Sequence, residues 1–174
     1  MRIYQSVSLV GIMGAGKTCI AKKLAKKLDL YHIDTDKEIK TKTGLSVKQL
    51  IDTEQSDLLK TVEFEIIKEH CHKKCVVSTG DHTVNNQKAW DYLMQNSLSV
   101  WINLSLVQIL QRLKPSENRP FFPTELTLQH LKEIYNERKK KYFLSKIQIR
   151  SLNASKVEDL LKIIQHFLSE SIVI

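Results

Sequence analysis

A complete phosphate-binding loop, G-x-x-x-x-G-K-[ST], occupies residues 11–18 and constrains this chain more than any other feature. An apolar run at residues 3–10 precedes it, and residues 17–28 follow with apolar side chains on one face and lysines on the other. The loop therefore lies between a buried strand and an amphipathic helix, the context in which such loops hold phosphate. We predict that the chain binds a nucleoside triphosphate.

Each residue type in this loop has a physical reason. Glycines let the backbone turn so that successive amides point inward and, with the helix N-terminus, form an anion site. Lys17 brings a positive charge to the β- and γ-phosphates of ATP, and the Thr18 hydroxyl is expected to ligate Mg²⁺. The predicted nucleotide-binding residues of the loop are Gly11, Gly14, Ala15, Gly16, Lys17, Thr18 and Cys19. We expect the Cys19 thiol to pack in the core.

The remainder of the chain alternates between short apolar runs and amphipathic segments. The runs at 3–10, 30–34, 75–78, 98–104 and 147–149 predict strands. Helices are predicted at 17–28, from 36 to a break at 43–44, after a Ser46 cap, and at 57–72, 87–94, 105–113, 126–144 and 157–168. This alternation predicts an α/β fold with a parallel sheet covered on both faces. Without repeats or linkers, residues 1–174 form one expected domain.

Composition limits the classes of protein without choosing one. Apolar residues make up 42% and charged residues 26%, which is typical of globular chains. Three cysteines argue against a disulfide-stapled secreted domain, and no apolar run is long enough to span a membrane. The net charge of +8 favours anionic partners. We expect a cytoplasmic monomer that does not bind membranes. We also expect no binding to nucleic acid, because the lysines are spread over several helices.

A second acidic motif follows the second predicted strand. Asp34 and Asp36 flank Thr35 at the carboxyl end of that strand, the edge where ligands of open α/β sheets bind. One carboxylate could hold Mg²⁺ through water, and the other could accept a hydrogen bond from a substrate hydroxyl. An aspartate before a helix is also a common N-cap. In a protein with a phosphate-binding loop, we favour the functional interpretation.

Four motifs in this order resemble the shikimate kinase family. They are GIMGAGKT at 11–18, DTD at 34–36, Arg119-Pro120 in a proline-containing loop, and Glu137-Arg138 with Tyr142 beyond. The similarity runs from about residue 8 to residue 168. It implies a nucleoside-monophosphate-kinase-like fold with a five-stranded parallel sheet, and transfer of the ATP γ-phosphate to the 3-hydroxyl of shikimate. This reaction belongs to chorismate and aromatic amino acid biosynthesis.

The resemblance also implies roles for individual residues. Lys17, Asp36 and Arg119 would be catalytic, Asp36 meeting the substrate hydroxyls and Arg119 closing over the phosphates. Asp34 would place the metal through water, Arg112 would stack on adenine, and Arg138 would bind the shikimate carboxylate. Residues 114–125 would form a lid, and residues 34–63 the helical substrate-binding region. Lid closure suits phosphoryl transfer, because water must be kept out.

Two positions depart from the family pattern. Lys60 stands where the family has an arginine for the substrate carboxylate, so the charge remains and the planar fork is lost. Glu63 follows at a spacing that allows a Lys60–Glu63 pair. Gly80, Asp81 and His82 replace three consecutive glycines whose amides would contact substrate. Asp81 adds negative charge near anionic ligands, unless it turns away or pairs with Lys60; a metal-positioning carboxylate is the alternative.

These departures leave more than one function open. The first hypothesis is a shikimate kinase, with Lys60, Gly80, Asp81 and His82 lining the substrate site. The second changes the acceptor to another hydroxy acid or sugar acid, and the third is a nucleotide-binding homologue without activity. The cluster at 70–75, with two histidines and two cysteines, is interpreted as a helix end and a buried strand rather than a zinc site.

Overall fold

The computed structural model describes residues 4–113 and 127–169. Within them, five strands form one sheet in the order β2-β3-β1-β4-β5, with every neighbouring pair parallel. The strands are β1 (Ser6–Val10), β2 (Tyr31–Asp34), β3 (Cys75–Ser78), β4 (Leu98–Ile102) and β5 (Ile147–Ile149). Because all strands run in one direction, the loops that follow them gather at one edge.

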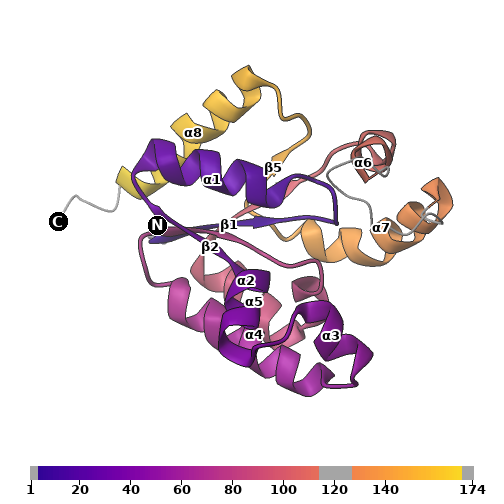
Figure 1. Ribbon diagram of the computed structural model, residues 1–174. Helices are drawn as coiled ribbons and strands as arrows, with labels where there is room; N and C mark the ends of the chain where they lie inside the picture. The colour runs from indigo at the N-terminus through magenta and orange to yellow at the C-terminus, as the bar shows by residue number, and fades with distance from the viewer. Residues whose placement is uncertain (1–3, 114–126, 170–174) are drawn as a thin grey trace.

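Helices connect these strands and cover both faces of the sheet. They are α1 (Lys17–Leu28), α2 (Thr35–Thr43), α3 (Val47–Asp52), α4 (Ser56–His70), α5 (Gln87–Asn96), α6 (Leu106–Leu113), α7 (Leu128–Tyr142) and α8 (Ala154–Ser169), with a 3₁₀ turn η1 (Thr83–Asn85). Figure 1 shows α1 and α8 on one face and α4 and α5 on the other, with α6 and α7 beside the edge where β1 ends. The predicted three-layer α/β/α architecture is confirmed.

The core lies between the sheet and these helices. Strands β1, β3 and β4 are buried at every residue, as the central strands of a parallel sheet should be. Trp90 and Trp101 are almost fully buried, which confirms the prediction that both are packing residues. A second apolar cluster packs α2, α3 and α4 against one another, and it consists of Ile39, Leu50, Leu59, Val62 and Ile66. The helical region at 34–63 therefore has a small core of its own.

Most predicted element ends are right to within a few residues. The strand expected to reach residue 104 ends at Ile102, and the helix expected to reach residue 72 ends at His70. Ser46 caps α3 as predicted, with a reciprocal capping box to Gln49. The prediction for Cys19 is wrong: this residue is exposed, because it lies on the face of α1 opposite the buried Ile20, Ala21 and Leu24.

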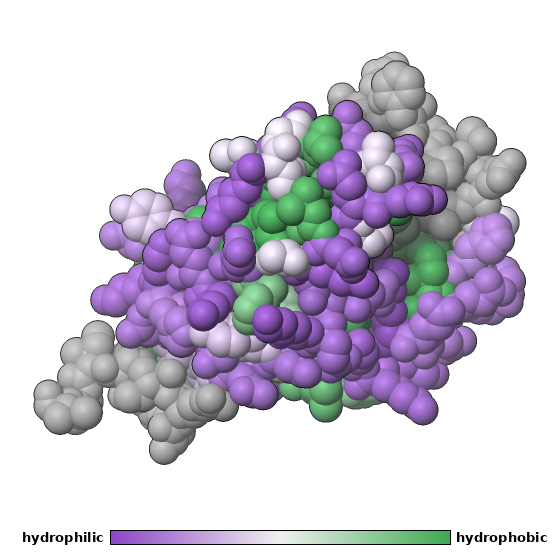
Figure 2. Space-filling model, turned by 90° about the horizontal axis from the view of Figure 1, so that it is seen from below, coloured by the Kyte–Doolittle hydropathy of each residue, from purple (hydrophilic) through white to green (hydrophobic). Residues whose placement is uncertain are grey.

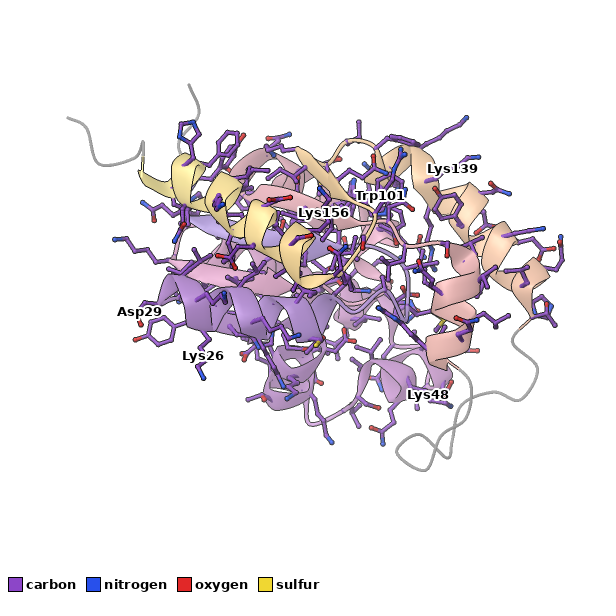
Figure 3. All side chains as sticks on the ribbon, turned by 90° about the horizontal axis from the view of Figure 1, so that it is seen from above. Lys26, Asp29, Lys48, Trp101, Lys139 and Lys156 are labelled. Atoms are coloured by element: carbon purple, nitrogen blue, oxygen red, sulfur yellow. The ribbon has the colours of Figure 1, made fainter. Side chains whose placement is uncertain are left out.

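The surface carries its charge on several elements. Lys26 on α1, Lys48 on α3 and Lys139 on α7 lie at separate places on the periphery, whereas Trp101 lies inside the ribbon (Figure 3). Seen from below, the surface is mostly hydrophilic with smaller apolar areas between polar side chains (Figure 2). Within the described part of the chain, no helix is long and apolar enough to cross a membrane.

Candidate active site

Three loops meet where β1, β2 and β3 end. The phosphate-binding loop follows β1, the Asp34–Asp36 motif lies at the end of β2, and Gly80 follows β3. The pairing register places Asp34 opposite Ser78, and the Thr79 amide donates to the Leu9 carbonyl (3.2 Å). Segments far apart in the sequence thus meet at the carboxyl edge of the sheet, where ligands of open α/β sheets bind.

The phosphate-binding loop has the backbone shape that anion binding requires. Gly16 is the N-cap of α1 with φ +95°, a conformation that favours glycine, and no side chain caps the helix. The first turn of α1 contains no acidic residue. Its first amides are therefore left for a phosphate, in the favourable field of the helix dipole. The Lys17 ammonium lies over the same loop, donating to the carbonyls of Gly11 (2.7 Å) and Ile12 (3.2 Å).

A cleft of about 440 Å³ opens beside this loop. The residues around it are Gly14, Gly16, Lys17, Thr18, Cys19 and Arg112. Arg112, near the end of α6, donates to the Ala15 carbonyl at 3.4 Å. The cleft thus brings together six of the predicted nucleotide-binding residues, whereas Gly11 and Ala15 do not line it and Arg119 lies outside the described residues. The exposed Cys19 belongs to the cleft wall rather than to the core.

Oxygen ligands suitable for a magnesium ion lie next to the loop. The Thr18 hydroxyl donates to Asp34 Oδ2 at 3.0 Å, and the Ser78 hydroxyl approaches the same oxygen at 3.4 Å. Asp34 also caps α2, accepting from the Lys37 amide at 3.4 Å. The interpretation of Asp34 as a helix cap is confirmed, and its role toward a metal stays a prediction. A hydroxyl and one carboxylate fit Mg²⁺, which takes most of its other oxygens from phosphates and water.

Asp36, in the first turn of α2, lies against the backbone of Gly80. A Cβ placed on Gly80 would overlap Asp36 Oδ1 and lie 3.2 Å from its Cγ. The Gly80 amide donates to the Thr35 hydroxyl at 2.7 Å, which fixes the loop after β3 against the start of α2. A methyl group added at Gly80 would therefore displace the exposed Asp36 carboxylate from its position beside this loop.

Asp81 pairs with Arg138 and not with Lys60. Arg138 Nη1 donates to Asp81 Oδ2 at 2.8 Å and to the Asp81 carbonyl at 3.1 Å. The neighbouring Lys141, also on α7, donates to the Val84 carbonyl at 2.9 Å. This contact ties α7 to η1. The sequence named Arg138 as a functional residue but gave no sign of its partner.

Lys60 and Glu63 do not form the pair that their spacing allows. The Lys60 ammonium lies 3.8 Å from Asp57 with 56% of its side chain exposed. Glu63 is buried and accepts from Thr83 (2.6 Å) and Asn86 (2.9 Å). The two residues point to different sides of α4, because Glu63 belongs to the face that packs against η1 and α5. Sequence reasoning missed this network, whose partners come from a segment with no regular pattern.

Burial and neighbouring charges shift the pKa values of three groups here. Burial lowers the pKa of the Lys17 amine, and the carboxylates of Asp81 and Asp36 oppose that change. Burial and then Asp34 raise the pKa of Asp36. Burial also raises the pKa of Glu63, against the hydrogen bonds from Thr83 and Asn86. Groups with shifted pKa values that lie close together are typical of active sites.

Two further predictions concern the lid and His82. Residues 114–125, predicted to form the lid and containing Arg119, lie outside the described residues. His82 is half-buried at the start of η1, and its charge acts on the pKa values of Asp36 and Glu63.

A phosphate-binding loop with a carboxylate close enough for its charge to act on Lys17 suits phosphoryl transfer to a hydroxyl. The sheet order, the loop that opens α1 and the cleft between them place the chain among P-loop kinases that resemble nucleoside monophosphate kinases. Comparisons with known proteins narrow this class. The family model for shikimate kinase matches residues 13–168.

Individual relatives agree with that match. The shikimate kinase of Synechococcus elongatus is 32% identical over 142 residues, covering 81% of this chain and 74% of that protein. The one from Aquifex aeolicus is 30% identical, covering 86% of each. A solved shikimate kinase from Acinetobacter baumannii, in complex with shikimate, superposes with a TM-score of 0.79 at 27% identity, covering 97% and 96%. The chain belongs to the shikimate kinase family.

Proposed function

We propose that this protein transfers the γ-phosphate of ATP to the 3-hydroxyl of shikimate. Family membership supports this reaction, and the related Acinetobacter baumannii enzyme was solved with shikimate. The single observation that carries the proposal is that Asp36 lies close enough to Lys17 of the phosphate loop for its charge to act on that amine, together with the Thr18–Asp34 hydrogen bond beside the same loop. A phosphate site and a carboxylate that can bind a hydroxyl are thus neighbours.

Lys17 and the loop amides would perform the electrostatic part of the reaction. The transferred phosphoryl group carries charge on its outer oxygens, so fixed cations and amides stabilise it without reorganisation. Lys17 is half-buried against the loop carbonyls, and partial exclusion of water strengthens its interaction with a phosphate. Although burial lowers the pKa of this amine, a bound polyphosphate would favour its charged form.

Asp36 would position the acceptor. Its carboxylate lies against Gly80 and can accept a hydrogen bond from a hydroxyl entering the cleft. Its raised pKa makes the carboxylate a stronger base. A stronger base is better suited to take the hydroxyl proton as the oxygen attacks phosphorus. Positioning of this kind supplies much of the rate in phosphoryl transfer.

Thr18 and Asp34 would hold Mg²⁺, Thr18 directly and Asp34 through water. The fit rests on their oxygen atoms and their 3.0 Å hydrogen bond beside the phosphate loop. When bound, Mg²⁺ neutralises phosphate charge. We further propose one kinase domain whose residues 114–125, with Arg119, close over the phosphates. We also propose a cytoplasmic monomer, in keeping with the three free cysteines.

A purified-protein assay tests the proposal. We expect ADP release from Mg-ATP that depends on added shikimate. Lys17→Ala should reduce it at least about 10³-fold, because the positive charge that contacts the transferred phosphoryl group is lost. The control is Lys26→Ala, an exposed lysine on the same helix. Lys60 favours a second candidate, another hydroxy acid, because its ammonium lies at the surface rather than in the cleft. A better acceptor than shikimate in a metabolite panel would support that candidate.

A further inference from the structure

The Asp81–Arg138 ion pair joins two segments 57 residues apart at the acceptor side of the cleft. Its side chains are only 20% and 13% exposed, respectively. Asp81 follows directly on Gly80, which packs against Asp36. The charges of Asp81, Asp36 and Arg138 all act on Lys17. The pair therefore lies within the field of the reacting groups and not on the outer surface.

Arg138 is also the group best suited to an acidic acceptor. Shikimate carries a carboxylate, and a planar guanidinium matches a carboxylate with two parallel hydrogen bonds. Four other cations that the structure describes near the cleft have contacts of their own. Arg112 donates to the Ala15 carbonyl on the nucleotide side, and Lys17 lies on the phosphate loop. Lys60 lies at the surface beside Asp57, and Lys141 donates to the Val84 carbonyl. An acceptor carboxylate and Asp81 would thus seek the same guanidinium.

The pair is incomplete, which leaves it open to exchange. Only Nη1 of Arg138 and Oδ2 of Asp81 join the two side chains. Asp81 Oδ1 and Arg138 Nε are buried, and neither atom has a hydrogen bond of good geometry among the described residues. Tyr142 is the other side chain on α7 that interacts with the Arg138 guanidinium. A buried polar atom without a partner costs free energy. A ligand carboxylate that engages both edges of the guanidinium would remove part of that cost.

We propose that Asp81 is a specificity-determining residue, an internal carboxylate that competes with the acceptor's carboxylate for Arg138. This inference rests on the proposed function. Binding of shikimate then requires Asp81 to release Arg138 or to share it with a like charge. The apparent affinity falls by the fraction of molecules in which Arg138 is available. An acceptor without a carboxylate avoids this competition.

Asp81→Asn tests the competition directly, because asparagine keeps a carbonyl oxygen for Arg138 and removes the charge. We expect the KM for shikimate to fall about tenfold, the change for a guanidinium available one time in ten, with kcat within about twofold. The KM for shikimate methyl ester should stay within about twofold. Asp159→Asn removes the same charge from an exposed pair on α8 and should change neither KM.

Three results would overturn the inference. These are a higher KM for shikimate in Asp81→Asn, an unchanged one, or equal falls for shikimate and its methyl ester. Failure of the proposed function looks different, because then no variant releases ADP in response to shikimate. In that case calorimetry with ADP and shikimate decides: tighter binding to Asp81→Asn supports the competition. Equal binding, or no binding to either protein, contradicts it.

Discussion

Replacing Gly80 with alanine adds one methyl group where the structure has no room for it. That methyl would overlap Asp36 Oδ1 and lie 3.2 Å from Asp36 Cγ. Gly80 has no positive φ, so alanine suits its backbone and the conflict is steric. The loop after β3 is tied to the Thr35 hydroxyl by the Gly80 amide at 2.7 Å. The carboxylate is therefore the part that must move.

An overlap of this size requires the carboxylate to withdraw by about 1 Å, and misplacement of that order costs about 10²-fold in rate. This corresponds to about 2.7 kcal/mol of lost transition-state stabilisation. We expect Gly80→Ala to lower kcat/KM for shikimate by about that factor, measured by coupled ADP release. Nucleotide binding should be unchanged, because Gly80 does not line the cleft beside the phosphate loop.

Gly44→Ala is the matched control. Gly44 has φ +74° and open space around an added Cβ, so alanine strains the backbone without touching the cleft. It should lower the melting temperature and leave kcat/KM within about twofold. If Gly80→Ala kept full activity, Asp36 would not need its position against Gly80, and the role assigned to that carboxylate would be wrong.

Two further predictions concern buried and metal-binding acids. Because burial raises the pKa of Glu63 above 4.5, the folded state holds this proton longer than the unfolded state, and stability falls as pH rises through that window. The melting temperature of Glu63→Gln relative to wild type should therefore rise from pH 5 to about pH 8, whereas that of the exposed control Glu65→Gln should not. The same difference from wild type at both pH values would contradict the raised pKa of Glu63. Asp34→Asn keeps the helix cap and should raise the Mg²⁺ concentration for half-maximal activity about tenfold or more. An unchanged Mg²⁺ requirement would remove Asp34 from the metal site.

The fold was predictable because its signals are local. The phosphate loop fixes a strand before it and a helix after it, and the predicted helix at 17–28 and the strands at 75–78 and 147–149 have the observed limits. Strand order is different, because it depends on which loops cross the sheet, and no residue pattern records that directly. The resemblance supplied the five-stranded parallel sheet, and the structure supplied its order.

The site was predictable in its members and less so in its contacts. Thr18 and Asp34 lie together as expected, because Thr18 is in the helix that starts after β1 and Asp34 ends β2 at the same edge of the sheet. The Asp81–Arg138 pair joins positions 57 residues apart, and its formation depends on where α7 packs against η1. Glu63 faces inward for a similar reason, since Thr83 and Asn86 satisfy its oxygens. Long-range partner choice of this kind is a property of packing, which one sequence does not encode legibly.

The most direct test of this account is ADP release by the purified protein with Mg-ATP, with and without shikimate. We expect shikimate-dependent turnover that Lys17→Ala removes and Lys26→Ala preserves. We also expect a product that carries the transferred phosphate on the 3-hydroxyl of shikimate. Tight ATP binding with no shikimate-dependent turnover and no phosphorylated product would contradict the central claim.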